Sequence, residues 1–169
     1  MQGKVARHMK LSGQEEYGLR CLLRLADDAP GGSLSIPQIA AAEGLSIPYV
    51  AKLMRLLRRG GFVRSTRGQL GGYTLPRPAA QITVGEVLAV LGGRIYDSDF
   101  CRHHTGNTRF CTNSVDCSIR PLWRTLQSMV DQVLDKTTLQ DLLQSEPAVA
   151  AWAGNIIKVS DVLPAPPKP

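Results

Sequence analysis

Residues 46–75 read SIPYVAKLMRLLRRGGFVRSTRGQLGGYTL, a helix pattern followed directly by two β-type runs. Ser46 is a favourable N-cap, and Pro48 lies in the first turn, where its missing N–H costs nothing. Apolar residues then recur at helical spacing and predict one buried face. That face comprises Val50, Leu53, Met54 and Leu57, and the opposite face carries Lys52, Arg55 and Arg59. The segment therefore predicts an amphipathic helix with a basic outer side.

The β-type runs at 62–66 and 73–75 flank a glycine-containing stretch, 67–72, which is the pattern of a β-hairpin. Upstream, Ser35 and Gln38 have the spacing of a capping box at the start of a shorter helix. Two short helices joined by a tight glycine turn form a helix-turn-helix, and a hairpin directly behind the second helix forms a wing. The predicted fold class is mainly α with a small β-hairpin: a winged helix-turn-helix domain followed by a long helix.

Further helix patterns lie on both sides of this segment. Residues 15–26 predict a helix with one apolar face, Leu19, Leu22, Leu23 and Ala26, and residues 83–91 and 137–143 predict two short helices. Between them, apolar residues alternate at spacings of three and four, the seam of a helix that pairs with a second copy of itself. The seam residues are Ile119, Leu122, Leu126, Met129 and Val133. We expect a homodimer; packing of this seam on the chain's own N-terminal domain is the alternative.

The chain divides into four kinds of segment. Residues 9–91 form the predicted winged helix-turn-helix domain, 92–118 a cysteine-containing loop, and 119–145 the dimerisation helix with a short C-terminal helix. Residues 1–8 and the Pro-rich stretch 147–169 are predicted to be flexible. The better-patterned sequence begins at Met9, so either Met1 or Met9 is compatible with the native start.

Positive charge is concentrated in the first half of the chain. Residues 1–91 contain 12 Lys or Arg and 6 Asp or Glu residues, whereas residues 92–169 contain eight of each. No acidic residue occurs between Glu43 and Glu86, a span that includes the predicted second helix and the wing. Such a stretch attracts phosphates and steers association. A solvated helix face is the alternative interpretation of this charge. The position of the charge on the predicted helix-turn-helix and wing favours double-stranded DNA as the partner.

Three of the four cysteines lie in the polar stretch 92–118, which is too irregular to fold without something that organises it; they are Cys101, Cys111 and Cys117. Thiolates suit an iron–sulfur cluster or zinc, although the absence of C-x-x-C pairs disfavours a zinc ribbon. Metal-free thiol sensing is a third possibility. His103 and His104 are either further ligands or solvated imidazoles. Cys21, near the apolar face of the first helix, is predicted to be a packed small residue.

Composition and motifs argue against several classes of protein. No apolar run reaches the ~18 residues of a membrane helix, and the polar, basic residues 1–8 lack the apolar stretch of a signal peptide. We therefore expect a cytoplasmic protein without a membrane partner, in which thiols stay reduced. The motifs G-x-S-x-G and H-E-x-x-H and nucleotide-binding loops are absent. We expect neither an enzyme nor a small-molecule substrate.

Short motifs spread over residues 9–143 match those of a known family. They are residues 9–12, 16–20, 39–40, 44–46, 49, 67–68, 71–73 and 82–87, with the cysteine loop, Leu122-Trp123 and residues 137–139. On these motifs the chain resembles the IscR/NsrR-type winged-helix regulators of bacteria, which include iron–sulfur and nitric-oxide sensors. The wing pattern Arg-Gly-x-x-Gly-Gly-Tyr at 67–73 is the most specific of them, although the family often has glycine where Leu70 stands.

The resemblance implies a homodimeric transcriptional regulator that binds palindromic operator DNA and senses iron–sulfur status, redox state or nitric oxide. In this motif the N-terminal part of the second helix enters the major groove, and basic residues behind it meet phosphates. The predicted DNA-binding residues are Ser46, Pro48, Tyr49, Lys52 and Arg59 of the helix and Arg67, Gly71, Gly72 and Tyr73 of the wing.

The resemblance also implies an iron–sulfur cluster, of the 2Fe-2S type in preference to 4Fe-4S, held by the three loop cysteines. Some relatives use a histidine shortly after the last cysteine, where this chain has Ile119 and Arg120. Others take a carboxylate from the N-terminal helix of the partner subunit, and the matching residue is Glu16. His103 and His104 are the alternative fourth ligands. A metal-free thiol-based or zinc-binding, redox-responsive repressor of the same fold is the alternative function.

Overall fold

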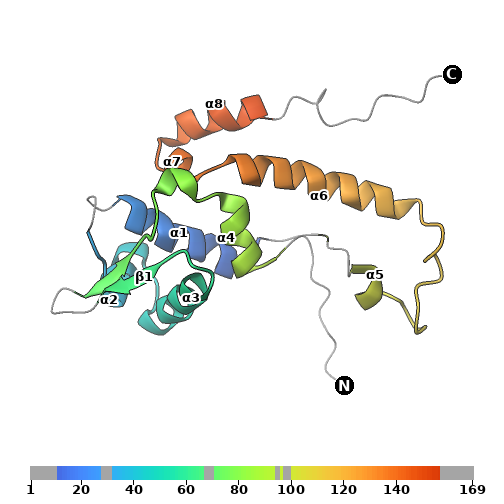
Figure 1. Cartoon of the computed structure of the whole chain (residues 1–169), viewed down its shortest axis with the longest axis horizontal. Helices are drawn as coiled ribbons and strands as arrows, with labels where there is room; N and C mark the ends of the chain where they lie inside the picture. Colours follow the sequence, from blue (N-terminus) through green and yellow to red (C-terminus); the bar gives the residue numbers. More distant parts are fainter. Residues whose placement is uncertain (1–10, 28–31, 67–70, 94–95, 97–99, 157–169) are drawn as a thin grey trace.

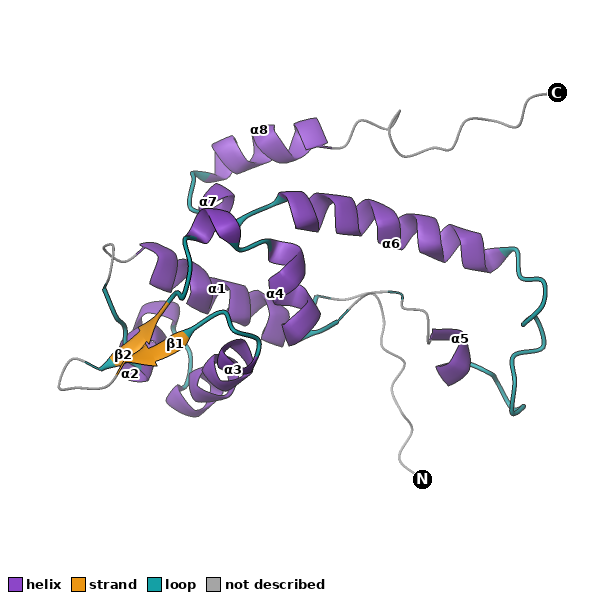
Figure 2. Cartoon of the chain, viewed as in Figure 1, coloured by secondary structure: helices purple, strands orange, loops and turns teal. Residues whose placement is uncertain are grey.

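The computed structural model describes residues 11–27, 32–66, 71–93, 96 and 100–156 of the chain. The elements are mainly helical, with one two-stranded antiparallel sheet (Figures 1 and 2). In chain order they are α1 (Gly13–Asp27), α2 (Ile36–Glu43), α3 (Ile47–Arg59), β1 (Arg64–Thr66), β2 (Gly72–Thr74), the 3-10 helix η1 (Ala79–Gln81), α4 (Val84–Leu91), α5 (Phe100–His103), α6 (Ile119–Lys136), α7 (Leu139–Leu142) and α8 (Glu146–Ile156). The predicted winged helix-turn-helix followed by a long helix is confirmed.

The helix-turn-helix consists of α2 and α3. The Gln38 side chain accepts a hydrogen bond of 2.9 Å from the Ser35 backbone N–H, as the capping-box spacing predicts. Gly44 has φ 65°, a left-handed conformation that glycine adopts without strain, and it makes the tight turn into α3. The predicted buried face of α3 is confirmed, because all four of its apolar residues, Val50, Leu53, Met54 and Leu57, are 0% exposed.

The buried face of α1 differs from the predicted one. Its fully buried positions are Gly18, Cys21, Leu22 and Leu25, whereas Leu19, Leu23 and Ala26 are only half-buried. The reason is the packing of α4: a side chain at Gly18 would collide with Leu91, so the two helices approach each other at this glycine. The helix is therefore turned so that Gly18 and Cys21 face the core.

The wing is a short hairpin with an additional partner. Strands β1 and β2 pair antiparallel, with Ser65 opposite Tyr73. Leu34, which precedes α2, pairs with Tyr73 from the other side: its N–H donates to Tyr73 O at 3.1 Å, and Tyr73 N–H donates to Leu34 O at 2.8 Å. The hairpin is thereby attached to the start of the helix-turn-helix. Residues 67–70 at its tip, which include the predicted DNA-binding residue Arg67, lie outside the described residues.

The long helix α6 is attached to the domain at its C-terminal end and projects beyond the body formed by α1–α4 (Figure 1). Val84 N–H donates to Thr137 O at 2.8 Å, and Leu139 N–H donates to Ile82 O at 2.9 Å. A side chain at Gly85 would collide with Asp135, so this glycine allows α4 and α6 to lie close together. Within the described residues, no helix combines the length and the apolar character needed to cross a membrane.

Two segments predicted to be irregular contain helices. The cysteine loop includes α5, and residues 146–156, which fall largely in the stretch predicted to be flexible, form α8. Residues 147–156, which were predicted to be flexible, are helical in the structure. Pro147 lies in the first turn of α8, where proline is tolerated, and the helix contains several alanines, the residue with the highest helix propensity. Residues 1–8 and 157–169 lie outside the described residues.

Candidate nucleic-acid interface and cysteine loop

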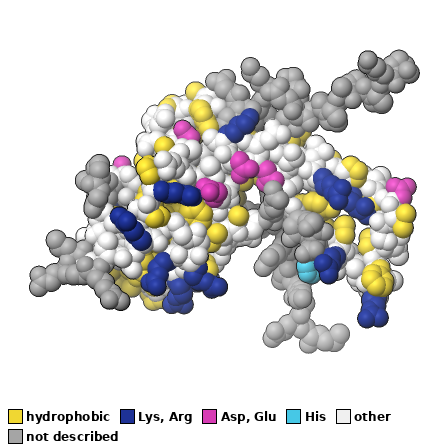
Figure 3. All heavy atoms as spheres, in the orientation of Figure 1, with side chains coloured by type: hydrophobic (Ala, Val, Ile, Leu, Met, Phe, Trp, Pro, Cys, Tyr) yellow, Lys and Arg dark blue, Asp and Glu magenta, His cyan; other side chains and the backbone are white. Residues whose placement is uncertain are grey.

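The outer face of α3 carries four exposed cations: Lys52, Arg55, Arg58 and Arg59. None of the four forms an ion pair with any residue that the structure describes. Figure 3 shows Lys and Arg side chains gathered at the lower edge of the domain, in the region of α3. Because no carboxylate within the described part of the chain pairs with these cations, this face presents a local positive field to a polyanion.

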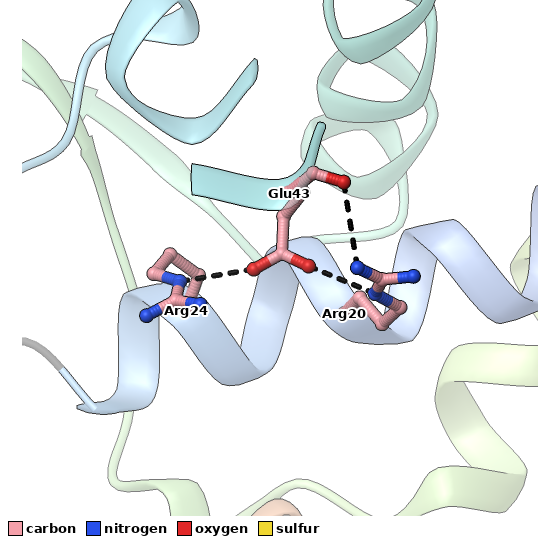
Figure 4. Close-up of polar contacts among 3 residues, drawn as sticks. All are labelled: Arg20, Arg24 and Glu43. Atoms are coloured by element: carbon pink, nitrogen blue, oxygen red, sulfur yellow. Dashed lines mark hydrogen bonds and ion pairs between the residues drawn. The ribbon is translucent and has the colours of Figure 1, made fainter. Parts of the chain in front are cut away.

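Three other arginines of the domain, Arg20, Arg24 and Arg77, form ion pairs within the chain. Glu43, at the end of α2, lies between Arg20 and Arg24 of α1, whose Nε atoms are 2.8 and 2.9 Å from its two carboxylate oxygens (Figure 4). The Glu43 side chain is only 6% exposed, so the two ion pairs are largely shielded from water on the Glu43 side and hold the end of α2 against α1. Arg77 pairs with Glu86 at 3.0 Å and lies over the Phe62 ring. Carboxylates thus pair with these three arginines, whereas the four exposed cations of α3 form no ion pair with a described residue.

The first turn of α3 presents a different set of side chains from the predicted one. Ser46 and Pro48 are exposed, as a DNA-contacting turn requires, and Ser46 makes no side-chain capping hydrogen bond. Tyr49 instead turns back toward α1, where its ring packs edge-on against Tyr17 with centroids 6.0 Å apart. Ile47, which the sequence analysis did not select, is 54% exposed. Ile47 lies three residues before Val50 and seven before Met54, in register with the apolar stripe, so helical periodicity alone predicts its burial.

Two of the predicted wing residues have structural roles in the hairpin. Gly72 lies against Leu34: a Cβ there would be 2.7 Å from the backbone C and O atoms of Leu34. Tyr73 is half-buried and packs against the core while its backbone pairs with Leu34. Gly71 is half-buried at the edge of the described hairpin. The glycine at 72 is therefore required by an intramolecular contact, whether or not the wing also meets DNA.

The three loop cysteines are free thiols, and all three are half-buried. Cys101 lies on α5, and Cys111 and Cys117 lie in the turns before α6. Among the residues that the structure describes, no three His, Cys, Asp or Glu side chains are grouped so that they could hold a metal ion. The donors therefore fit an iron–sulfur cluster or zinc in chemical kind, but their arrangement in the single chain does not preform the site.

The candidate fourth ligands lie on α1 and at or just after the C-terminal end of α5. Glu16 is exposed in the first turn of α1. His104 stacks on Phe100 with ring centroids 3.9 Å apart, and its Nδ1 lies 2.8 Å from the Phe100 carbonyl oxygen. That contact places the ring proton on Nδ1 and leaves Nε2 available. His103 is exposed at the end of α5.

Among the contacts that link the cysteine loop to α6, the one at Tyr96 involves a buried side chain. Tyr96 N–H donates to Gln127 Oε1 at 2.8 Å, and Gln127 Nε2 donates to Asp131 Oδ1 at 2.7 Å. Gln127 is only 8% exposed, and the Tyr96 hydroxyl lies 3.8 Å from Cys101 Sγ. Burial, followed by the hydrogen bond to Cys101, raises the pKa of the Tyr96 hydroxyl. The neighbourhood of a loop cysteine is thus connected to a buried amide of the long helix.

Comparison with known proteins places this architecture among transcriptional regulators. Residues 11–145 match the Rrf2 family, described as iron-dependent transcriptional regulators. The transcriptional regulator IscR of Cronobacter sakazakii is 30% identical over 138 residues, 82% of each chain. The solved structure of T. potens IscR is 33% identical with a TM-score of 0.63, covering 82% of this chain and 89% of that one. CymR, the global cysteine regulator of B. subtilis, is 33% identical with a TM-score of 0.65, covering 80% and 97%.

These relatives are regulators and not enzymes, which confirms the prediction that the chain has no catalytic function. The family covers the helix-turn-helix, the wing, the cysteine loop and α6 together. The winged-helix architecture and the resemblance found in the sequence are confirmed by the same comparisons. The chain belongs to the Rrf2 family and is a DNA-binding transcriptional regulator.

Proposed function

We propose that this regulator acts as a homodimer on palindromic operator DNA, with the N-terminal turn of α3 in the major groove and the wing alongside. The observation that carries the proposal is the outer face of α3, where Lys52, Arg55, Arg58 and Arg59 are exposed and form no ion pair with a described residue. Phosphate neutralisation by such a face supplies affinity, and the exposed first turn supplies contacts to bases.

Dimerisation is supported by the apolar seam of α6. Ile119 and Leu122 are 56% and 53% exposed, and Leu126 is 36% exposed. Large exposed apolar side chains in a row along one helix face are typical of an interaction surface. A second copy of the same helix supplies a complementary apolar surface against which they can be buried. A two-fold dimer also matches an operator with two related half-sites.

The DNA-binding proposal is tested by the double substitution Lys52→Ala with Arg59→Ala. If both cations meet phosphates, operator affinity falls, and the slope of log K against log salt becomes shallower by about one unit for each lost contact. Lys136→Ala, which removes an exposed cation at the end of α6, serves as the charge control. Unchanged affinity and slope in the double variant would place the interface elsewhere.

We further infer that the cysteine loop senses iron–sulfur or redox status. The three half-buried free thiols, the family's description as iron-dependent and the similarity to T. potens IscR support this role. Cys101, Cys111 and Cys117 would hold the cluster, with Glu16 of the partner subunit or a loop histidine as fourth ligand. When bound, the cluster would supply redox- and nitric-oxide-sensitive chemistry; the chain's own residues connect the loop to α6 through Tyr96 and Gln127.

A metal-free thiol regulator is the second candidate. It is favoured by the similarity to CymR, the global cysteine regulator of B. subtilis. In this case oxidation of the loop thiols, and not loss of a cluster, would change the conformation of the loop. The two candidate functions share the proposed DNA interface. They differ in whether the loop cysteines hold a cluster or act as free thiols.

Purification without oxygen, followed by a visible absorption spectrum, separates the two candidates. A cluster gives a coloured protein whose absorption is lost in each of the variants Cys101→Ala, Cys111→Ala and Cys117→Ala and is retained in Cys21→Ala. Glu16→Ala changes the spectrum only if that carboxylate is a ligand. A colourless protein, free of iron and zinc, whose operator affinity changes on thiol oxidation supports the second candidate. A sensing role would be refuted if operator affinity were the same with and without a cluster and with reduced and oxidised loop thiols.

A further inference from the structure

Ile47, the first residue of α3, is an apolar side chain on an otherwise basic surface. It is 54% exposed, whereas the four apolar residues that face the core from the same helix are 0% exposed. The basic residues Lys52, Arg55, Arg58 and Arg59 are exposed on the outer side of this helix. Among the described residues of α3, Ile47 is thus the exposed large hydrophobic side chain of the face that we assign to DNA.

The fold of the described residues does not account for this side chain. The residue before the N-cap often packs on the helix as a hydrophobic staple, and here Leu45 occupies that position and packs against the core. Ser46 is the N-cap and Pro48 occupies the first turn, so the start of the helix is specified without Ile47. More than half of the Ile47 surface is exposed, so the domain covers only the smaller part of this side chain.

We propose that Ile47 contacts the 5-methyl group of a thymine in the major groove and is a specificity-determining residue of this regulator. The inference rests on the proposed docking of the first turn of α3 in the groove. Thymine presents a methyl group there, which apolar side chains recognise by contact, whereas the neighbouring Ser46 hydroxyl can bond to base edges. Contact with Ile47 would therefore select an A·T pair at one position in each half-site.

The test removes only the methyl group from the DNA. An operator is first selected from a pool of random duplexes with the full-length wild-type chain. Each dT is then replaced in turn by deoxyuridine, which lacks the 5-methyl group, and the affinity is measured. We expect one symmetry-related pair of positions at which replacement weakens binding about fourfold for each half-site, the effect of a buried methyl-sized group.

Variants assign that loss to Ile47. Ile47→Ala should bind the thymine and uracil duplexes equally at the same positions while keeping the wild-type salt dependence, because no phosphate contact is lost. Ile47→Val, a smaller change that preserves the fold, should show an intermediate ratio. Val90→Ala, which truncates an apolar side chain that is 38% exposed on α4, should keep the wild-type ratio.

Two results would overturn the proposal on Ile47 alone: no uracil replacement weakens the wild-type protein, or Ile47→Ala shows the same loss as the wild type. In both cases salt-dependent binding to the selected operator would remain, and the proposed DNA interface would stand. Failure of the wild-type chain to select any sequence would instead refute sequence-specific DNA binding and the role of Ile47 with it.

Discussion

Cys21 and the three loop cysteines share a functional group but lie in different environments. Cys21 is 0% exposed in α1, and burial, together with the negative charge of Glu43, raises the pKa of its thiol to about 11. The loop cysteines are half-buried on a polar segment. A thiol that stays protonated and covered cannot act as a metal ligand or a nucleophile at neutral pH. The predicted structural role of Cys21 agrees with this environment.

The buried thiol should make stability depend on pH. Because its pKa is about 11 in the folded chain and 9.0 in the unfolded reference, ionisation favours the unfolded state. The stabilisation is fully present below pH 9 and is lost as the pH rises through 11, about 2–3 kcal/mol in total. The free energies of unfolding of the wild type and Cys21→Ala, measured by denaturant titration, should therefore converge as the pH rises from 9 through 11. Parallel pH profiles of wild type and Cys21→Ala would contradict the assignment.

Tyr49 and Ile47, two residues apart in α3, lie in different environments. An aromatic residue near the start of a recognition helix is a reasonable DNA contact, yet Tyr49 packs edge-on against Tyr17 of α1. Successive residues of a helix point about 100° apart, so a small rotation decides which of them faces the core. The packing of α3 on α1 determines that rotation, and it leaves Ile47 outside.

At the scale of elements, the wing depends on a segment far from it in the sequence. The two backbone hydrogen bonds between Leu34 and Tyr73 extend the hairpin toward α2, and Gly72 allows the close approach. The orientation of the wing relative to α3 is therefore set jointly by β2 and by the residues before α2. An isolated hairpin would not require glycine at position 72; the close contact with the Leu34 backbone does.

Gly72→Ala should loosen this attachment. Its new Cβ would lie 2.7 Å from backbone atoms of Leu34, so the strand has to shift and the two hydrogen bonds weaken. We expect a loss of about 1–3 kcal/mol of stability, measured by thermal unfolding, and faster hydrogen exchange at the amides of Leu34 and Tyr73. Ser65→Ala, an exposed position on β1, is the matched control. Unaltered exchange at both amides in Gly72→Ala would show that the contact is dispensable.

At the scale of the whole molecule, α6 joins the cysteine loop to the DNA-binding domain. Its C-terminal end is hydrogen-bonded to the residues around α4, its middle holds Tyr96 through Gln127, and its N-terminal half leaves apolar residues exposed. In a dimer built on this helix, a change in the loop would act on the element that sets the spacing of the two recognition helices. Displacement of a packed helix is a known way in which a structural change at one site alters the arrangement of distant parts of a protein.

Leu126→Glu should therefore produce a monomer. In the proposed dimer this carboxylate would be buried against its symmetry mate at a cost of about 3 kcal/mol or more, which weakens dimerisation by more than about 100-fold. Sedimentation measures the association state, and affinity for an operator with two half-sites should fall with it. Ser128→Glu adds the same charge to an exposed position of α6 outside the seam and should leave the dimer intact. A stable dimer of Leu126→Glu would exclude the seam as the interface.

Much of this protein was determined by local sequence. The buried stripe of α3, the capping box at Ser35, the glycine turn at Gly44 and the hairpin are encoded in residues a few positions apart, where periodicity and backbone preference act directly. The family motifs and the acid-free stretch between Glu43 and Glu86 are equally properties of the chain itself. For these features, sequence pattern and structure agree.

Only the tertiary structure decided the contacts between distant residues. The pairing of Leu34 with Tyr73, the turn of Tyr49 toward Tyr17 and the bond from Tyr96 to Gln127 depend on which surfaces meet in space, and no local pattern encodes them. The separation of the three cysteines has the same origin. Their spacing along the chain identifies thiols that can act together, but proximity is a property of the folded loop, whose polar residues contribute little buried surface to hold them in one place.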